Sequence, residues 1–516
     1  MQAAEQEIDY LGMLNPAQRL AAEFGERTDG RGFESGPLLV IAGAGTGKTM
    51  TLAHRVAHLV IEGVDPERIL LLTFTRRAAE EMTRRVENIV RGSAPDSTVL
   101  PPGGLPWAGT FHSVANRLLR RFAHNLGLDP GFSVLDRGDA ADMLDVVRHE
   151  LKLTRTSRRF PKKDTCLAIY SRRVNAQQPL ADVLDQVFPW CADWAEELAA
   201  LFRGYVDRKQ QSQSLDYDDL LLYWMHLVAE PEFAEEIGSW FDHILVDEYQ
   251  DTNILQARVL NALKPDGSGL TVVGDDAQSI YSFRSAEVEN ILGFPDQFTP
   301  TARVVTLEQN YRSTQAILDA ANCLIAESER QYRKDLFSEG RDGARPHHVT
   351  VEDGDAEAEY VVSAILANRE LGMQLRDQAV LFRGSHHSDR LELELVRRNI
   401  PYVKYGGLKF LEAAHVKDLL SVLKWAENPR NEVAAFRVLK LLPGMGPAYA
   451  ARCYESLACH DFSVTTLRDF RPPASASEEW EGFCELMKTL SASEMEDRGW
   501  QGQMTLVRRW YQPHLE

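Results

Sequence analysis

The stretch "PLLVIAGAGTGKTMTLAHRVAHLV", residues 37–60, constrains the fold of this 516-residue chain more than any other. Its apolar residues 38–41 predict a buried strand, and the apolar residues that recur at helical spacing after residue 48 predict a helix. The glycine-rich turn between them lets successive backbone N–H groups converge on one anion. A strand, a glycine-rich turn and a helix in this order predict a phosphate-binding loop in an α/β sheet.

The last two residues of this loop have expected chemical roles. Lys48 is expected to bring positive charge to the terminal phosphates of a nucleotide, and Thr49 is expected to hold a magnesium ion. The first position is alanine, where the simplest form of the pattern has glycine. The predicted nucleotide contacts are Ala42, Gly43, Ala44, Gly45, Thr46, Gly47, Lys48 and Thr49.

A phosphate loop needs a second strand that ends in carboxylates, and "FDHILVDEYQDTN" at residues 241–253 supplies one. Asp247, at the tip of the apolar run, is expected to hold the magnesium ion through water. Its neighbour Glu248 is expected to polarise the attacking water as a general base. For these two residues alone a strand followed by an acidic turn would be the simpler interpretation, and the phosphate loop favours the metal site over it.

The overall charge does not identify a partner. The formal net charge is −19, whereas a nucleic-acid partner requires Lys and Arg to neutralise its phosphates. Basic clusters do occur, at "TRRAAEEMTRR", "RLLRRF" and "LTRTSRRFPKK". Each cluster alone is more often a solvated helix face than a binding surface, so composition leaves the partner open.

The cysteines and the apolar runs indicate a cytoplasmic globular protein. The six cysteines are scattered without a CxxC pair, which argues against zinc, iron–sulfur clusters and a disulfide framework, and we expect them to be reduced and buried. The longest apolar runs, "PLLVIA" and "RILLLTF", have the length of strands and not of membrane spans. The first residues show no secretion signal, and no membrane partner is expected.

The segment "VGDDAQSIYSFRSA", residues 273–286, places an amide, two aromatic rings and an arginine directly after two aspartates. Taken alone, it is best explained as a surface turn whose aromatic residues fold back into the core. It is one of eight segments, however, that occur in the order of a known family. They are "LNPAQRLA" (14–21), "AGAGTGKT" (42–49), "LLTFTRRAAEEM" (71–82), "GTFHS" (109–113), "LDYDDLL" (215–221), "LVDEYQDTN" (245–253), "VGDDAQSIYSFRSA" (273–286) and "LEQNYRST" (307–314).

Through these segments the chain resembles superfamily 1 DNA helicases of the UvrD/Rep/PcrA type. The resemblance implies ATP and Mg²⁺ as cofactors, with Gln278 sensing the terminal phosphate while Tyr281, Phe283 and Arg284 face single-stranded DNA. An amide can rearrange its hydrogen bonds when the phosphate leaves without burying another charge. Aromatic faces stack on any base and therefore hold DNA without reading its sequence.

Other roles follow from the same resemblance. Gln18 resembles the glutamine that reads the adenine edge, and Tyr311 resembles the tyrosine that stacks on that base. Arg312 resembles the arginine that reaches the terminal phosphate from the second motor domain.

Four further positions match residues that line the DNA path of the family: Phe74, Thr75, His112 and Tyr217. Two of them keep an alternative interpretation. Phe74 ends an apolar strand and could belong to the core, and a single histidine such as His112 is more often structural.

The positions of the segments predict the domain organisation. Lys48 and Asp247 must meet around one nucleotide although about 200 residues separate them, which is more than a motor sheet needs. The fold class is therefore α/β, with P-loop NTPase (RecA-like) motor domains and inserted α-helical subdomains. The predicted parts are the first motor domain at 1–114 and 215–305, a helical insertion (1B-like) at 115–214, the second motor domain at 306–414, and a second helical insertion (2B-like) at 415–516. In the second motor domain, "QAVLFR" (378–383) is expected to be a strand and "DRLELELVRR" (389–398) a helix.

The predicted function is an ATP-dependent 3′ to 5′ translocase and helicase in DNA repair or replication, acting on single-stranded DNA and 3′-tailed duplexes. The alternatives are a nucleotide-gated single-strand-binding module that does not unwind, and the motor part of a helicase–nuclease. After Leu442 no strand with a glycine-rich turn and no arginine-rich "TRA"-like helix follows, although the family carries both. We therefore expect a chain that ends inside the second helical insertion and unwinds DNA poorly alone.

Overall fold

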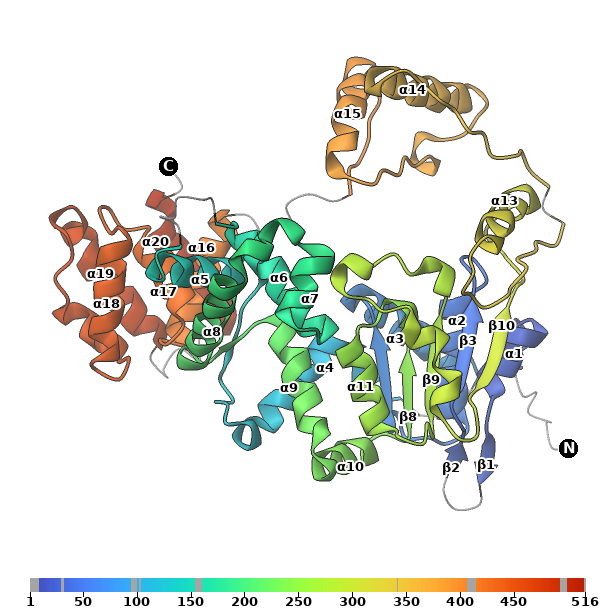
Figure 1. Cartoon of the computed structure of the whole chain (residues 1–516), viewed down its shortest axis with the longest axis horizontal. Helices are drawn as coiled ribbons and strands as arrows, with labels where there is room; N and C mark the ends of the chain where they lie inside the picture. The colour runs from blue at the N-terminus through green and yellow to red at the C-terminus, as the bar shows by residue number, and fades with distance from the viewer. Residues whose placement is uncertain are drawn as a thin grey trace, which may run out of the picture.

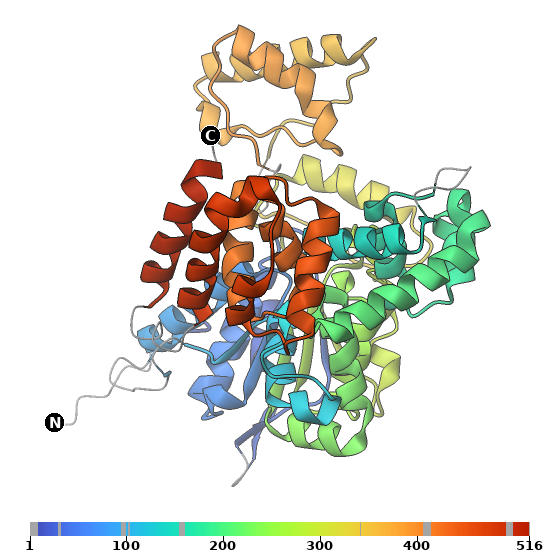
Figure 2. The same cartoon turned by 90° about the vertical axis from the view of Figure 1, so that its left-hand side faces the viewer.

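The computed structural model describes residues 9–28, 32–93, 100–101, 104–153, 160–340, 342–405, 414–491 and 499–514 (Figures 1 and 2). Its centre is a six-stranded parallel sheet with the strand order β10-β3-β9-β8-β4-β5. The strands are β3 (Leu38–Ala42), β4 (Ile69–Thr73), β5 (Trp107–Thr110), β8 (His243–Val246), β9 (Leu270–Gly274) and β10 (Arg303–Leu307). A parallel sheet among many helices confirms the α/β class that the sequence predicted.

Both faces of the sheet are buried, which explains why its central strands are continuous apolar runs. Side chains alternate along β3, so that Leu38 and Val40 face one helical layer while Leu39 and Ile41 face the other. The first layer is made of α2 (Lys48–Ile61) and α3 (Arg76–Ser93), and the second of α4 (Phe111–Arg121), α9 (Tyr217–Ala229) and α11 (Ile254–Leu263). Short elements complete this part: α1 (Pro16–Glu23), β1 (Glu26–Thr28), β2 (Gly32–Glu34), α10 (Pro231–Ser239) and α12 (Glu289–Leu292).

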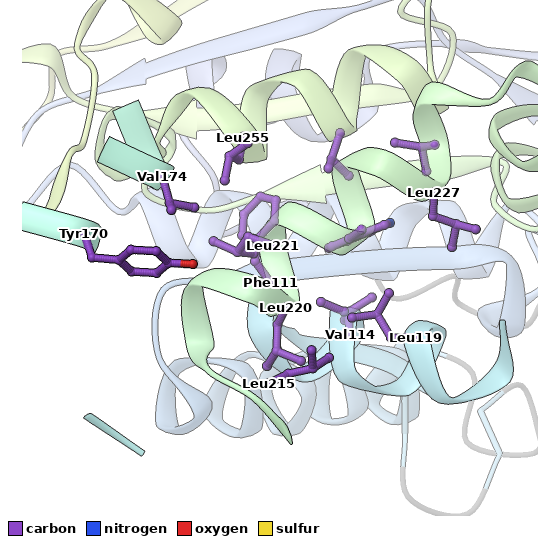
Figure 3. Close-up of a cluster of buried hydrophobic side chains, with 14 of the residues drawn as sticks. Phe111, Val114, Leu119, Tyr170, Val174, Leu215, Leu220, Leu221, Leu227 and Leu255 are labelled. Carbon is purple, nitrogen blue, oxygen red and sulfur yellow. The ribbon is translucent and has the colours of Figure 1, made fainter. Parts of the chain in front are cut away.

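A helical insertion leaves the sheet after α4 and returns before α9. It contains α5 (Arg137–Glu150), α6 (Lys163–Ala176), α7 (Leu180–Val187) and α8 (Ala195–Gln211). The strands β6 (Ser133–Val134) and β7 (Ser214–Leu215) pair where the chain departs and comes back. Figure 3 shows that Tyr170 and Val174 of α6 reach the same buried cluster as Phe111 of α4 and Leu221 of α9. The insertion and the sheet therefore share one core.

Buried charges also lie at the base of the insertion. Lys209 of α8 lies 2.7 Å from Asp216 and 2.6 Å from Asp219, and all three side chains are almost completely buried. The Asp218 carboxylate accepts hydrogen bonds from Ser171 and Asn175 of α6. The start of α9 is thus joined to the insertion by polar contacts as well as by apolar packing.

After β10 the residues that the structure describes form helices without a further sheet. These are α13 (Gln315–Ala326), α14 (Gly354–Glu370) and α15 (Ser388–Arg397), and α15 confirms the helix predicted at 389–398. The strand predicted at 378–383 is wrong, because these residues have no regular structure and Leu381 is 94% exposed. A strand needs a neighbour for its backbone hydrogen bonds, and within 342–405 the structure contains no other strand.

The last helices form a unit with its own core, built around Trp425, Phe483 and Met487. They are α16 (Ala414–Glu427), α17 (Glu432–Leu439), α18 (Pro447–Ala458), α19 (Ser477–Ser491) and α20 (Gly499–Tyr511). In both views they lie beside α5 and α8, whereas α14 and α15 stand apart (Figures 1 and 2). Ion pairs join the two helical units, with Lys417 3.0 Å from Asp136 and Lys424 2.7 Å from Asp139.

Three sequence predictions can be compared directly with this fold. The predicted division at 114/115 falls inside α4 and that at 305/306 falls inside β10, and the division into domains stays a prediction. All six cysteines are free, but Cys323 and Cys459 are exposed, so the expectation of burial was wrong for these two. In the part of the chain that the structure describes, no helix combines the length and apolarity needed to cross a membrane.

Candidate nucleotide and nucleic-acid site

The phosphate loop (residues 42–49) connects β3 to α2 in a conformation that depends on glycine. Gly45 has φ +82° and Gly47 has φ +86°, both in the left-handed region that glycine adopts without strain. The Thr46 hydroxyl is buried and donates to the Gly43 carbonyl oxygen at 2.8 Å, which closes the turn. Lys48 and Thr49 follow as the first residues of α2, at the helix end whose free N–H groups attract anions.

The strand order brings the two predicted nucleotide-binding segments together. Parallel strands present their carboxyl ends at one edge of a sheet, and only β9 separates β3 from β8. Across this edge the Lys48 Nζ lies 2.7 Å from Glu248 Oε2, with 10% of the lysine side chain and 33% of the glutamate side chain exposed. Glu248 is thus paired with the lysine cation that a terminal phosphate would bind.

Asp247 and Glu248 have different environments. Burial, the largest cause, and the adjacent Glu248 carboxylate together raise the pKa of Asp247 to about 7, while Lys48 opposes both effects. Glu248 has φ +51° and ψ +49°, a left-handed conformation that costs a residue with a side chain on the order of 1–3 kcal/mol. Backbone strain of this kind is concentrated at functional sites, where the surrounding structure maintains it. Here it accompanies the contact of Glu248 with Lys48.

The residues present fit a magnesium ion that arrives with a nucleotide. Within the described ranges, no group of three or more His, Cys, Asp or Glu side chains is placed to hold a metal ion by itself. Mg²⁺ commonly takes only one or two protein ligands and completes its shell with phosphate oxygens and water. Thr49, in the first turn of α2, and Asp247, directly after β8, match this requirement.

Hydrogen bonds extend from the Lys48–Glu248 pair to the loop that follows β9. The Glu248 carboxylate accepts from Gln250 Nε2 at 2.8 Å, and Gln250 Oε1 accepts from the Asp275 backbone N–H at 3.0 Å. Asp275 Oδ2 accepts in turn from Gln278 Nε2 at 2.6 Å. Sequence reasoning did not assign Gln250 or Asp275 a role, because spacing does not reveal which side chains meet across neighbouring strands.

The two residues predicted to contact the base, Gln18 and Tyr311, both form hydrogen bonds with Asn15. Gln18 Nε2 donates to the Thr46 carbonyl oxygen at 2.9 Å, so this side chain braces the phosphate loop. Asn15 Nδ2 donates to the Tyr311 hydroxyl at 2.9 Å, and the Tyr311 backbone N–H donates to the Gly45 carbonyl oxygen at 2.9 Å. The structure therefore gathers Gln18 and Tyr311 beside the loop, while their contacts with adenine stay predictions.

Arg312 is attached to the phosphate loop through its backbone. Asn310 Oδ1 accepts from the Arg312 N–H at 2.9 Å, and Asn310 Nδ2 donates to the Ala44 carbonyl oxygen at 2.5 Å. A Cβ atom added to Gly45 would lie 2.7 Å from the Arg312 Cβ, so this glycine permits the close approach. Asn310 is a further positioning residue that motif reading did not single out.

An aromatic row lies on the surface beyond Gln278, formed by Phe74, Tyr281 and Phe283. The Phe74 and Tyr281 ring centroids are 5.0 Å apart, and those of Tyr281 and Phe283 are 5.8 Å apart. Phe74 is 39% exposed and Phe283 is 68% exposed, so the interpretation of these rings as core residues is wrong. The side chain of Arg284 lies outside the described part of the chain.

Two of the remaining predicted DNA contacts, His112 and Tyr217, form a second group. His112 and Tyr217 pack edge to face with ring centroids 5.7 Å apart, and Tyr217 is half exposed. Burial lowers the pKa of His112 to about 4, so this ring is neutral near pH 7 and contributes no positive charge. The Thr75 hydroxyl accepts from the Ala78 N–H at 3.1 Å and thereby stabilises the start of α3.

Comparison with known proteins finds helicase families that match most of the chain. Residues 26–299 match the family described as "UvrD/REP helicase N-terminal domain", and residues 305–495 match "UvrD-like helicase C-terminal domain". The protein named ATP-dependent DNA helicase PcrA from Staphylococcus aureus is 35% identical over 417 residues, which cover 80% of this chain and 55% of that protein. The protein of the same name from Staphylococcus epidermidis is 36% identical with the same coverage. The chain spans about half the length of the curated relatives that it matches.

Proposed function

Because this chain belongs to the UvrD/REP helicase family, we propose that it is the ATP-driven motor part of a 3′ to 5′ DNA translocase and helicase. One observation carries the proposal: Gln278, joined through Asp275 and Gln250 to the Lys48–Glu248 pair, stands three residues before Tyr281 of the aromatic row. A change at the nucleotide thus has a short path, through hydrogen bonds to Gln278 and then along three residues of the chain, to the surface that would hold DNA.

At the nucleotide site, each residue would have a role that its side-chain chemistry suits. Lys48 would exchange Glu248 for a terminal phosphate oxygen, which releases the Glu248 carboxylate to orient and deprotonate water. Thr49 and Asp247 would hold the magnesium ion, which neutralises charge on the phosphates when bound. Arg312, on the segment that follows β10, would add a second cation to the terminal phosphate.

On the DNA side, the aromatic row would stack on bases of any identity. Stacking of a base on an aromatic side chain is worth about 1–3 kcal/mol and tolerates every sequence. Tyr217, at the start of α9, and Thr75, directly before α3, would add further contacts, and single-stranded DNA and 3′-tailed duplexes are the proposed substrates. The proposed setting is DNA repair or replication in the cytoplasm. The proposed domain division is the one that the motifs predict, with two motor domains and two helical insertions.

A second candidate function is a nucleotide-gated single-strand-binding module that does not unwind. The exposed chain at 378–383 favours it, because within 342–405 the structure contains no sheet that could serve as the core of a second motor domain. Translocation requires two domains that close on the nucleotide and reopen after hydrolysis.

The two candidates are separated by strand-displacement assays on duplexes with a 3′ tail, a 5′ tail or no tail. The motor predicts ATP-dependent unwinding of the 3′-tailed duplex and of neither other duplex, weak for this chain by itself, and loss of that unwinding in Glu248→Gln, which keeps the shape of the side chain but lacks the base. Single-strand binding that responds to ATP without unwinding of any duplex would favour the binding module. Unwinding of the 5′-tailed duplex would contradict the proposed polarity.

A further inference from the structure

The segment that follows α13 turns back across the nucleotide site and buries a lysine there. Lys334 Nζ lies 2.6 Å from Asp275 Oδ1 and 2.7 Å from Asp276 Oδ1, and only 3% of each of the three side chains is exposed. We call these three residues the lysine clasp. One cation thus joins the chain beyond β10 to two successive carboxylates that directly follow β9.

The clasp is held in place by neighbours on the same segment. The Tyr332 N–H donates to Asp276 Oδ2 at 3.1 Å, and its hydroxyl donates to the Leu292 carbonyl oxygen at 3.0 Å. Two residues beyond the lysine, Leu336 lies against the phosphate loop, since a Cβ added to Gly43 would lie 2.6 Å from the Leu336 Cδ2. The segment 332–336 therefore touches both the phosphate loop and the loop that carries Gln278.

Asp275 is the shared member of the clasp and of the network around the nucleotide. Its Oδ1 faces Lys334, while its Oδ2 accepts from Gln278 Nε2 at 2.6 Å. Its backbone N–H leads through Gln250 to Glu248 and Lys48. With both oxygens engaged, the carboxylate cannot turn without releasing either the lysine or the glutamine.

The loop is also held on its other side by the helical insertion. Arg172 of α6 donates from Nη1 to the Ser282 carbonyl oxygen at 2.7 Å, within the aromatic end of the loop. The loop 275–283 thus has one anchor toward the segment beyond β10 and another toward the insertion. Of these two anchors, the clasp is the one that includes Asp275, the acceptor of the Gln278 amide.

We propose that Lys334 is a positioning residue for nucleotide hydrolysis: by neutralising Asp275 and Asp276 it keeps the Asp275 carboxylate in the orientation that directs the Gln278 amide. The proposal rests on the proposed ATP hydrolysis and adds a regulatory link, since the lysine comes from the part of the chain proposed as the second motor domain. Without the cation, two adjacent buried carboxylates repel each other and must move or bind a proton. Either change alters the hydrogen bond to Gln278, whose side chain rotates easily once it is released.

The test compares Lys334→Met, which removes the charge, with Lys334→Arg, which restores it, and with Lys424→Met as a matched control. Lys424 also forms a lysine–aspartate pair, but with Asp139 between the two helical units. ATP hydrolysis is measured with and without oligo(dT), together with thermal melting. We expect Lys334→Met to lower kcat between about tenfold and hundredfold, because small misplacements of reacting groups cost this much. The KM for ATP should stay within about twofold, since the phosphate loop is unchanged.

The controls separate positioning from stability. Lys334→Arg should recover most of kcat, and Lys424→Met should keep the wild-type kcat even where its melting temperature falls. A wild-type kcat in Lys334→Met, or a loss seen only in KM, would overturn the inference. If Lys334→Met does not melt cooperatively, Asp276→Asn decides instead, because it weakens the clasp without changing Asp275 or Gln278 themselves. That variant should show a smaller loss of kcat at unchanged KM, and an unchanged kcat there would overturn the inference.

Failure of the proposed function can be distinguished from failure of this inference. If the wild-type chain does not hydrolyse ATP, the proposed function fails, and hydrogen exchange of residues 275–283 still tests the clasp. Loss of the anchor should speed amide exchange in this loop by about tenfold or more in Lys334→Met, because the loop opens locally more often. Equal exchange in the wild type and in Lys334→Met would refute the role of Lys334 in holding the loop.

Discussion

Two regions of the molecule contain the same kinds of side chain in different surroundings: the sheet region, residues 32–307, and the outer region, residues 342–405. Each has a close lysine–glutamate pair, Lys48–Glu248 at 2.7 Å and Lys404–Glu392 at 2.6 Å. Each also has an apolar run, but residues 243–246 form a fully buried strand whereas Leu381 in the run 378–383 is 94% exposed. The same sequence signal thus produces a strand only where other strands supply hydrogen bonds and a second layer covers the face.

The difference extends to the cores. The sheet region is packed on both faces by large clusters of buried residues, whereas the outer region buries a small cluster around Val362, Leu395 and Ile400 between α14 and α15. The Lys48–Glu248 pair lies beside the phosphate loop, where it can take part in hydrolysis. The Lys404–Glu392 pair only joins α15 to the chain that follows it. Matched substitutions in the two regions therefore test which surroundings matter.

The largest expected effect is on hydrolysis. Lys48→Ala removes the charge from the transferring phosphate and should lower ATP hydrolysis by about a hundredfold or more, while much single-strand binding survives. The matched Lys404→Ala removes the cation of the outer pair and should leave hydrolysis near the wild-type rate. Phosphate release and fluorescence anisotropy of a labelled oligonucleotide measure both properties. Full hydrolysis in Lys48→Ala would contradict the nucleotide site.

The next effect is on stability. Leu245 is completely buried in β8, so Leu245→Ala should lower the free energy of unfolding by about 2–5 kcal/mol. Leu381→Ala, in the exposed run of the outer region, should change it by less than about 0.5 kcal/mol. Urea denaturation of both variants gives the comparison. A large loss in Leu381→Ala would mean that the run 378–383 is covered in solution, and the contrast between the regions would then fail.

A smaller effect is expected on DNA binding. The double variant Tyr281→Ala/Phe283→Ala removes two rings of the aromatic row and should weaken single-strand binding by about 1–3 kcal/mol per lost stack, for every base composition. The matched pair Tyr360→Ala/Tyr402→Ala removes two half-exposed rings of the outer region and should leave binding unchanged. Anisotropy titrations with oligo(dT), oligo(dA) and mixed sequences test this. A loss restricted to one sequence would indicate direct reading of bases.

The smallest effect is a gain of stability that depends on pH. Burial, the largest cause, and the Asp216 charge together raise the pKa of Asp218 to about 6, so the folded state holds this proton more tightly than the unfolded state does. Its contribution to stability therefore falls as pH rises from about 4 to about 6 and stays low above that range. Asp218→Asn should raise the free energy of unfolding by about 1–2 kcal/mol at pH 8 and by little at pH 4.

A substitution of aspartate by asparagine in the outer region serves as the control for this prediction. Asp353 is an exposed residue at the start of α14, where asparagine stabilises a helix about as well as aspartate. Asp353→Asn should therefore leave the free energy of unfolding nearly unchanged at either pH. Thermal melts at pH 4 and pH 8 suffice, and a loss of stability in Asp218→Asn at pH 8 would show that the Asp218 carboxylate is needed as a charge.

Much of the sheet region could be predicted from the sequence because its signals are local. Apolar runs of strand length, glycines at 43, 45 and 47, and helical spacing after residue 48 each depend on neighbours a few residues apart. The same local rules identified α15. They failed at 378–383, because an apolar run specifies a strand only when the rest of the fold supplies its partners.

The sequence by itself determined the kinds of groups that this protein places at one sheet edge: a phosphate loop, a strand that ends in carboxylates, and a loop with Gln278, Tyr281 and Phe283. Only the tertiary structure decided how they are joined. Because β9 lies between β3 and β8, Gln250 and Asp275 connect Glu248 to Gln278, and Lys334 reaches the same carboxylate from a segment about 60 residues further along the chain. Side chains so far apart in sequence meet only through the strand order, which no local pattern encodes.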